Sequence, residues 1–160
     1  MIDKILETLD QRELEIATSI LEIPENIISQ EQSLIEEYDD RVRINIVSRG
    51  DSNCPFEILF GRKEHYGKMS WFVGLGAEVF DIEEVDNPEA ARNRKEDIEK
   101  FLKSKVRCEM HIAKGKIRKA LYFPSLYVVQ GQELSFAYVG DYIWPFVRTT
   151  KEVLHYEPWI

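Results

Sequence analysis

The fold class is decided by the stretch RVRINIVSRGDSNCPFEILFG, residues 41–61. In its first part the apolar side chains of Val42, Ile44 and Ile46 alternate with polar ones, which is the two-residue period of a half-buried strand. The segment RGDSNCP then has the composition of a turn, and FEILFG is a second candidate strand. Two strands joined by a short connection favour an antiparallel sheet.

Further strands are expected on the C-terminal side of this stretch. The loop RKEHYGK, residues 62–68, predicts a hairpin between FEILFG and the next strand, and KGK predicts a second hairpin. A third hairpin is expected around GQE, residues 131–133. The sheet should therefore contain about six to seven strands, with the later ones at residues 69–75, 105–113, 117–124, 125–130 and 134–139.

The clearest helix is expected at residues 88–104. Asn87 before Pro88 is typical of an N-cap followed by the first helical turn. The apolar residues Ile98, Phe101 and Leu102 share one helical face, so this face is predicted to pack on the sheet. A shorter helix is expected in TTKEVLHY, residues 149–156.

The first forty residues are predicted to be helical and form two helices, at residues 9–23 and 24–38. Asp10 followed by Glu13 has the spacing of a capping box, and Pro24 separates the two segments. The whole chain is therefore expected to be one α+β domain over residues 1–160. Residues 1–40 would be its helical, acidic part, and residues 41–160 would hold the mainly antiparallel sheet together with helix 88–104.

The charge is unevenly distributed, with a net value of −8 for the chain. Residues 1–40 hold 12 acidic and 2 basic side chains, whereas the remaining 120 residues hold 17 and 19. Because nucleic acids bind through Lys and Arg, this distribution argues against a nucleic-acid partner. It favours a basic protein partner, or simply solubility.

The compartment is expected to be the cytoplasm. Only two cysteines are present, which is too few for a disulfide scaffold. The N-terminus does not resemble a signal peptide, and no apolar run of about 18 residues predicts a membrane span.

The segment VRCEMHIA, residues 106–113, holds a Cys-x2-His spacing. If it is a strand, Cys108 and His111 point to opposite faces and cannot share one metal ion. Together with Cys54 and His65 they would supply the four residue types of a Cys2His2 zinc site. However, Cys108 falls on the same strand face as the apolar residues around it. We therefore predict that Cys108 is buried and binds no metal. The same geometry excludes His111 as the base of a Cys108 nucleophile, which would need another histidine, His65 or His155, brought close by the fold.

Glu109 and His111 do share a face of this strand. They would suit a general base held by a carboxylate, although mixed charge pairing on an exposed strand face is the simpler interpretation. The sequence contains no glycine-rich phosphate loop and no zinc-protease or serine-hydrolase motif. The spacing of a calcium loop is also absent. No cofactor is therefore expected, and the protein is predicted not to be an enzyme.

Partner binding is the remaining function class, and three features are candidates for it. Two are acidic clusters, EEYDD and DIEEVDNPE, and the third is the aromatic C-terminal tail, whose residue types are common interface anchors. The candidate contact residues are Glu36, Glu37, Asp39, Asp40, Glu83, Glu84, Asp86, Tyr142, Trp144 and Trp159.

Three functions remain open. The first is a bacterial immunity protein that neutralises a basic toxin, such as a nuclease, by stoichiometric contact through its acidic surfaces. The second is a small-molecule-binding or hydrolytic protein with a pocket on the sheet, using His111 with Glu109, or His65. The third is a structural or adaptor subunit that associates with itself.

Overall fold

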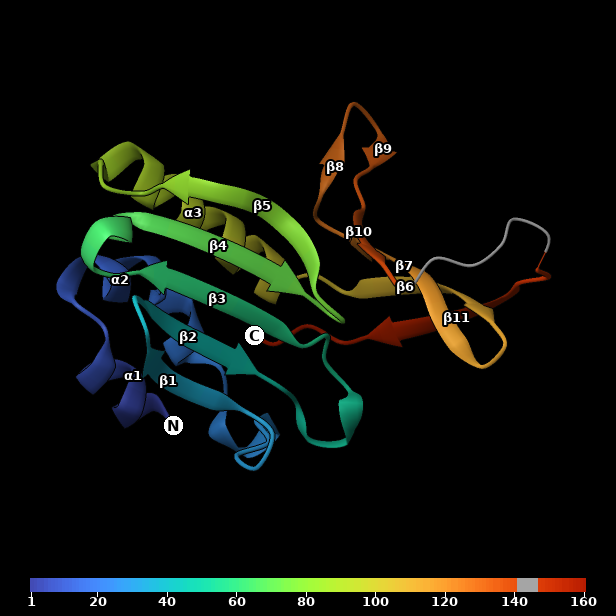
Figure 1. The fold of residues 1–160 in the computed structure, drawn as a ribbon, viewed down its shortest axis with the longest axis horizontal. Coiled ribbons are helices and arrows are strands. Elements are labelled where there is room, and N and C mark those ends of the chain that lie inside the picture. The colour runs from blue at the N-terminus through green and yellow to red at the C-terminus, as the bar shows by residue number, and fades with distance from the viewer. Residues whose placement is uncertain (141–146) are drawn as a thin grey trace.

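In the computed structural model, the stretch 41–61 forms the two strands that the alternation predicts, β2 (Arg41–Ile46) and β3 (Phe56–Gly61). They lie inside a five-stranded antiparallel sheet of order β1-β2-β3-β4-β5 (Figure 1). The other members are β1 (Leu34–Tyr38), β4 (Lys68–Val73) and β5 (Ala77–Glu84). The structure describes residues 1–140 and 147–160, with the backbone alone at 80 and 81.

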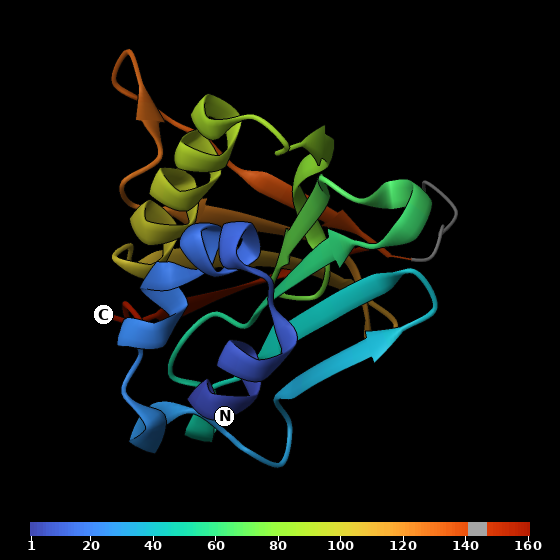
Figure 2. The ribbon, with the colours of Figure 1, turned by 90° about the vertical axis from the view of Figure 1, so that its left-hand side faces the viewer.

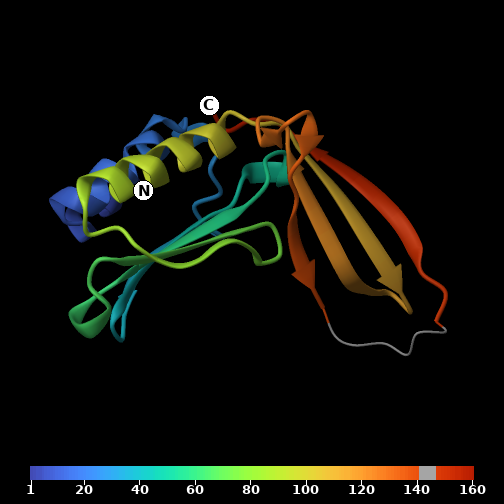
Figure 3. The same ribbon diagram turned by 90° about the horizontal axis from the view of Figure 1, so that it is seen from above.

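A second antiparallel sheet has the order β10-β7-β6-β11. Figure 3 shows that it projects from one end of the five-stranded sheet, on the side away from the helices. Its strands are β6 (Val106–Ala113), β7 (Lys116–Pro124), β10 (Phe136–Val139) and β11 (Thr150–Tyr156). A small hairpin joins β8 (Val128–Val129) to β9 (Gln132–Glu133).

The α+β class and the antiparallel arrangement are thus confirmed, but eleven described strands in three sheets exceed the six to seven expected in one sheet. The third hairpin is only partly correct. Residues 128–133 form β8 and β9, whereas β10 pairs with β7. Among the described residues, no helix is both long enough and apolar enough to cross a membrane.

The long helix α3 (Pro88–Leu102) forms as predicted, with the Asn87 side chain accepting a hydrogen bond from the N–H of Ala90. Its predicted face is confirmed, since Ile98, Phe101 and Leu102 are buried against the five-stranded sheet. The Phe101 ring makes edge-to-face contacts with two aromatic rings of that sheet. Figure 2 shows the N-terminal helical segment alongside α3, so both cover the same face of the sheet.

The N-terminal prediction is only partly right. The Asp10 capping box is present and begins α2 (Gln11–Ile16), after α1 (Ile2–Thr8) and before η1 (Thr18–Glu22). The second predicted helix is wrong, because residues 24–38 contain only the short η2 (Glu25–Ile27) followed by β1. Pairing with β2 buries Ile35 opposite Ile44, and this tertiary contact outweighs the helical spacing of the apolar residues.

The predicted C-terminal helix is also wrong. Residues 150–156 form β11, which pairs along its whole length with β6. The segment contains residue types that favour strands, among them Thr150, Val153 and Tyr156. The backbone hydrogen bonds to β6 extend the second sheet and leave β11 at its edge.

Candidate functional site

The alternation predicted for β6 is observed. Val106, Cys108 and Met110 are buried, and Cys108 lies opposite Tyr122 in β7. Ile112 leaves this pattern because a register shift follows His111. The prediction that Cys108 is buried is therefore confirmed.

The two thiols are poorly suited to nucleophilic chemistry. Cys54 and Cys108 are both buried and free, and burial raises the pKa of each thiol above its usual value. The reactive thiolate is thus disfavoured at neutral pH. No group of three or more His, Cys, Asp or Glu side chains within residues 1–140 and 147–160 is arranged to hold a metal ion.

Glu109 and His111 lie on the same face of β6, as predicted, but the carboxylate of Glu109 has other partners. It lies 2.9 Å from Lys151 Nζ and 3.4 Å from Arg107 Nε. The hydrogen bond with Lys151 lowers the pKa of Glu109. This arrangement is a mixed-charge strand face, the simpler of the two interpretations that the sequence allows.

The structure brings parts of the two acidic clusters to one end of the five-stranded sheet. Residues 39–40 form the β1–β2 turn, and β3 and β5 both end on this side (Figure 1). Glu84 lies at the end of β5, opposite Lys68. Five strands about 4.8 Å apart make this end about 20 Å wide. We call it the acidic end and define it by four exposed residues, Glu37, Asp39, Glu84 and Asp86, although the cations Arg41 and Lys68 lie at the same end of the sheet.

The other three acidic candidates are paired with basic side chains. Glu36 lies 3.7 Å from Arg43, Asp40 lies 3.0 Å from His65 and Glu83 lies 2.8 Å from Arg94. In contrast, the four residues of the acidic end form no ion pair with any residue that the structure describes. Among the seven acidic candidates, these four are therefore the ones most available to a partner.

A hollow adjoins the acidic end between α2, the β3–β4 connection and the start of α3. Three carboxylates line it, those of Asp10, Glu15 and Asp86. The guanidinium of Arg12 is also there and lies 5.9 Å from the centre of the Tyr66 ring. With more acidic than basic groups, the hollow suits a cationic side chain.

The aromatic tail does not supply the predicted anchor at Trp159. This side chain is buried, with 3% exposure, and its indole N–H donates a hydrogen bond to the carbonyl of Cys54 at 2.9 Å. The prediction of Trp159 as a partner contact is wrong in this structure, because the residue holds the C-terminus against the core. Tyr142 and Trp144 lie outside the described residues.

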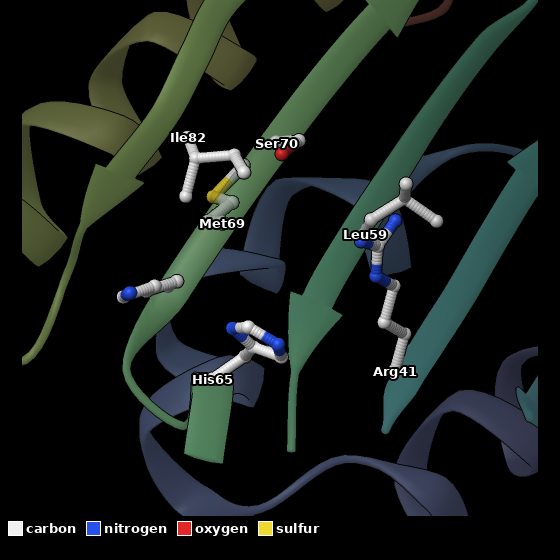
Figure 4. Close-up of a pocket in the computed structure, with 8 residues that line it drawn as sticks. Arg41, Leu59, His65, Met69, Ser70 and Ile82 are labelled. Carbon is white, nitrogen blue, oxygen red and sulfur yellow. The ribbon is translucent and has the colours of Figure 1, made fainter. Parts of the chain in front are cut away.

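A second hollow lies on the face of the five-stranded sheet that the helices leave open. Figure 4 shows side chains from four strands and the β3–β4 connection around it. We call it the His65 hollow. It is a small hollow of about 50 Å³ that opens to solvent, and its lining residues are Arg41, Leu59, Gly61, His65, Lys68, Met69, Ser70 and Ile82.

The sequence indicates His65 as one possible pocket residue but not the cations beside it. Arg41 occupies a polar position of an alternating strand, and Lys68 belongs to a predicted loop. Their meeting follows from strand order, since β2 and β4 flank β3. The residues next to Arg41 and Lys68 in sequence therefore give no indication that these two cations line the same hollow.

No protein-family model, no curated protein and no solved structure matches this chain. Function is therefore inferred from the geometry of the acidic end and of the His65 hollow.

Proposed function

We propose that the protein is a non-catalytic binding protein that contacts a basic partner protein through the acidic end. The observation that carries this proposal is the convergence of two acidic clusters, more than 40 residues apart in sequence, at one end of the sheet. Four of their carboxylates remain exposed and without an ion pair among the described residues. The net charge of −8 on the whole chain would also attract a basic partner protein.

The partner class that fits is a toxin domain with a basic substrate-binding surface, such as a nuclease, and the protein would then act as an immunity protein. Exposed carboxylates create a field that speeds the encounter with such a surface. Each partner contributes roughly 800 Å² to a standard interface, a patch about 30 Å across, and the acidic end, about 20 Å wide, fits within it. The adjoining hollow offers a place for one Lys or Arg side chain of the partner.

The first step of the test is to isolate the partner from native cells by affinity capture and to identify it by mass spectrometry. Association rates are then measured over a salt series for two variants. One variant neutralises the acidic end by Glu37→Gln, Asp39→Asn, Glu84→Gln and Asp86→Asn. The control neutralises four other exposed carboxylates that form no ion pair with any described residue, by Glu7→Gln, Glu22→Gln, Glu31→Gln and Glu78→Gln.

Both variants change the net charge by the same amount, so they separate a local contact from a general field. We expect the acidic-end variant to associate more slowly than the control and to lose most of its salt dependence. Equal rates for the two variants would contradict the proposed contact. An isolated partner with an acidic contact surface would contradict the proposed partner class.

A further inference from the structure

We infer that the His65 hollow binds a small organic carboxylate with a short apolar body. This inference does not depend on the proposed partner contact, because it concerns a small anion on the open face of the sheet. Three observations carry it: a gap between strands, two cations without carboxylate partners beside the gap, and an apolar floor.

The gap results from a glycine at the end of β3. Gly61 lies opposite Arg41 of β2, and Lys68 begins the neighbouring strand β4. Because adjacent strands are about 4.8 Å apart, the backbones of Arg41 and Lys68 are separated by about 10 Å, and Gly61 contributes no side chain of its own between them. A Cβ at Gly61 would approach the carbonyl oxygen of His65 to 2.0 Å. Glycine thus allows His65 to close the hollow at this end.

The charges around the gap favour an anion. Neither Arg41 nor Lys68 forms an ion pair with any described residue, although the chain has 29 acidic and 21 basic side chains. Three nearby arginines of the same domain do have carboxylate partners: Arg43 with Glu57, Arg62 with Glu13 and Arg94 with Glu83. Other exposed cations, such as Lys116 and Lys119, also lack carboxylate partners among the described residues, but Arg41 and Lys68 line the same hollow, so a carboxylate beside them would be attracted by both.

Two carboxylates that could compete with a bound anion are Asp40, which is paired with His65, and Glu84, which lies opposite Lys68. Asp40 is held by the imidazole of His65, with 3.0 Å between Oδ2 and Nε2. Glu84 lies opposite Lys68 in the register of β4 and β5, but no contact within ion-pair distance joins them. Glu84 would compete with a bound anion for Lys68, so neutralising Glu84 should strengthen anion binding.

The floor and one wall of the hollow are apolar. Met69 is 3% exposed and Leu59 is 9% exposed, so both present only part of their surface to the hollow. Ile82 is 58% exposed and stands beside Met69 (Figure 4). Covering this surface would favour a ligand with a short hydrocarbon body over an inorganic anion. The hydroxyl of Ser70 adds one neutral hydrogen-bond donor.

The test uses the full chain and three probes: hexanoate, inorganic phosphate, and hexan-1-ol as the neutral counterpart of the first. Backbone amide chemical shifts are followed by NMR during each titration. Hexanoate should saturate and shift the amides of Gly61, His65 and Ser70, whereas phosphate and hexan-1-ol should bind at least about tenfold more weakly.

Variants locate the interaction. The double variant Arg41→Gln, Lys68→Gln should weaken hexanoate binding at least about tenfold. The control Lys116→Gln, Lys119→Gln removes two exposed cations from the second sheet and should leave it unchanged. Glu84→Gln should tighten binding, because it removes the competing carboxylate. Thermal unfolding of each variant checks that the fold is retained.

The inference is overturned if hexanoate causes no saturable shifts around the hollow, or if hexan-1-ol binds as tightly as hexanoate. It is also overturned if the Arg41, Lys68 variant binds no more weakly than its control. A preference for phosphate over hexanoate would refute the organic ligand class. None of these results affects the proposed partner contact, for which the acidic-end variant and its control remain the test.

Discussion

Trp159 distinguishes a structural role of the C-terminus from a partner-binding role. Its ring makes an edge-to-face contact with Phe56, with 5.6 Å between ring centres, and its N–H satisfies the buried carbonyl of Cys54. The side chain of Asn53 also donates to the carbonyls of residues 157 and 158. Together these contacts attach the last residues of the chain to the start of β3.

The cost of two substitutions follows from these contacts. Trp159→Ala removes a large buried ring and leaves a carbonyl without its donor, which should reduce the free energy of unfolding by about 5 kcal/mol. Trp159→Phe keeps most of the apolar contact but loses the N–H, so it should cost about 1–2 kcal/mol. At about 3 °C per kcal/mol for a chain of this size, Tm should fall by about 15 °C and about 5 °C respectively.

Urea denaturation followed by far-UV circular dichroism measures both variants against the unmodified protein. The order should be unmodified protein, then Trp159→Phe, then Trp159→Ala, with similar m-values if unfolding remains two-state. The reasoning fails if Trp159→Ala unfolds within about 0.5 kcal/mol of the unmodified protein.

Three further substitutions test the core, a turn and a helix cap by urea denaturation. Phe101→Ala should cost about 3–5 kcal/mol, and an unchanged midpoint would mean that α3 packs differently. Gly74→Ala should cost about 3 kcal/mol, because its φ is +60° and a Cβ would overlap the Tyr122 ring, whereas Gly76→Ala, with open space, should cost less. Asp10→Ala should cost about 1 kcal/mol at pH 7. Burial raises the pKa of the Asp10 carboxyl, but hydrogen bonds from a backbone N–H and a tyrosine hydroxyl lower it by more, so that the pKa lies below its usual value. The Asp10 contribution is therefore present above the unfolded-state pKa and should disappear as the pH falls below about 4; a difference that persists in acid would contradict this.

Elements with a strong local pattern were predictable. The alternation of β2, the caps of α2 and α3 and the buried face of α3 all depend on residues close together in sequence. The opposite orientation of Cys108 and His111 likewise follows from strand geometry alone. In each case the local preference and the tertiary environment agree, so the pattern is sufficient.

The two wrong helices have the opposite explanation. Residues 34–38 and 150–156 occupy edge positions of their sheets, in β1 and β11. Each is short and contains charged residues that are acceptable in a helix or an exposed strand. Hydrogen bonding to a neighbouring strand selects the strand in both cases, across the hairpin turn to β2 for β1 and to the sequence-distant β6 for β11. The segments by themselves do not contain this information.

By itself the sequence determined the α+β class, the central hairpin, the long helix and the excess of carboxylates. Only the tertiary structure decided where those carboxylates lie, which of them are paired, and that Arg41 and Lys68 flank Gly61. The physical reason is strand order and register. In an antiparallel sheet alternate turns meet at the same end, so recognising β1 as a strand rather than a helix is what joins the β1–β2 turn to the end of β5. Charge and hydrophobicity are properties of single residues, whereas a binding surface requires that distant residues be placed within a few ångströms of one another.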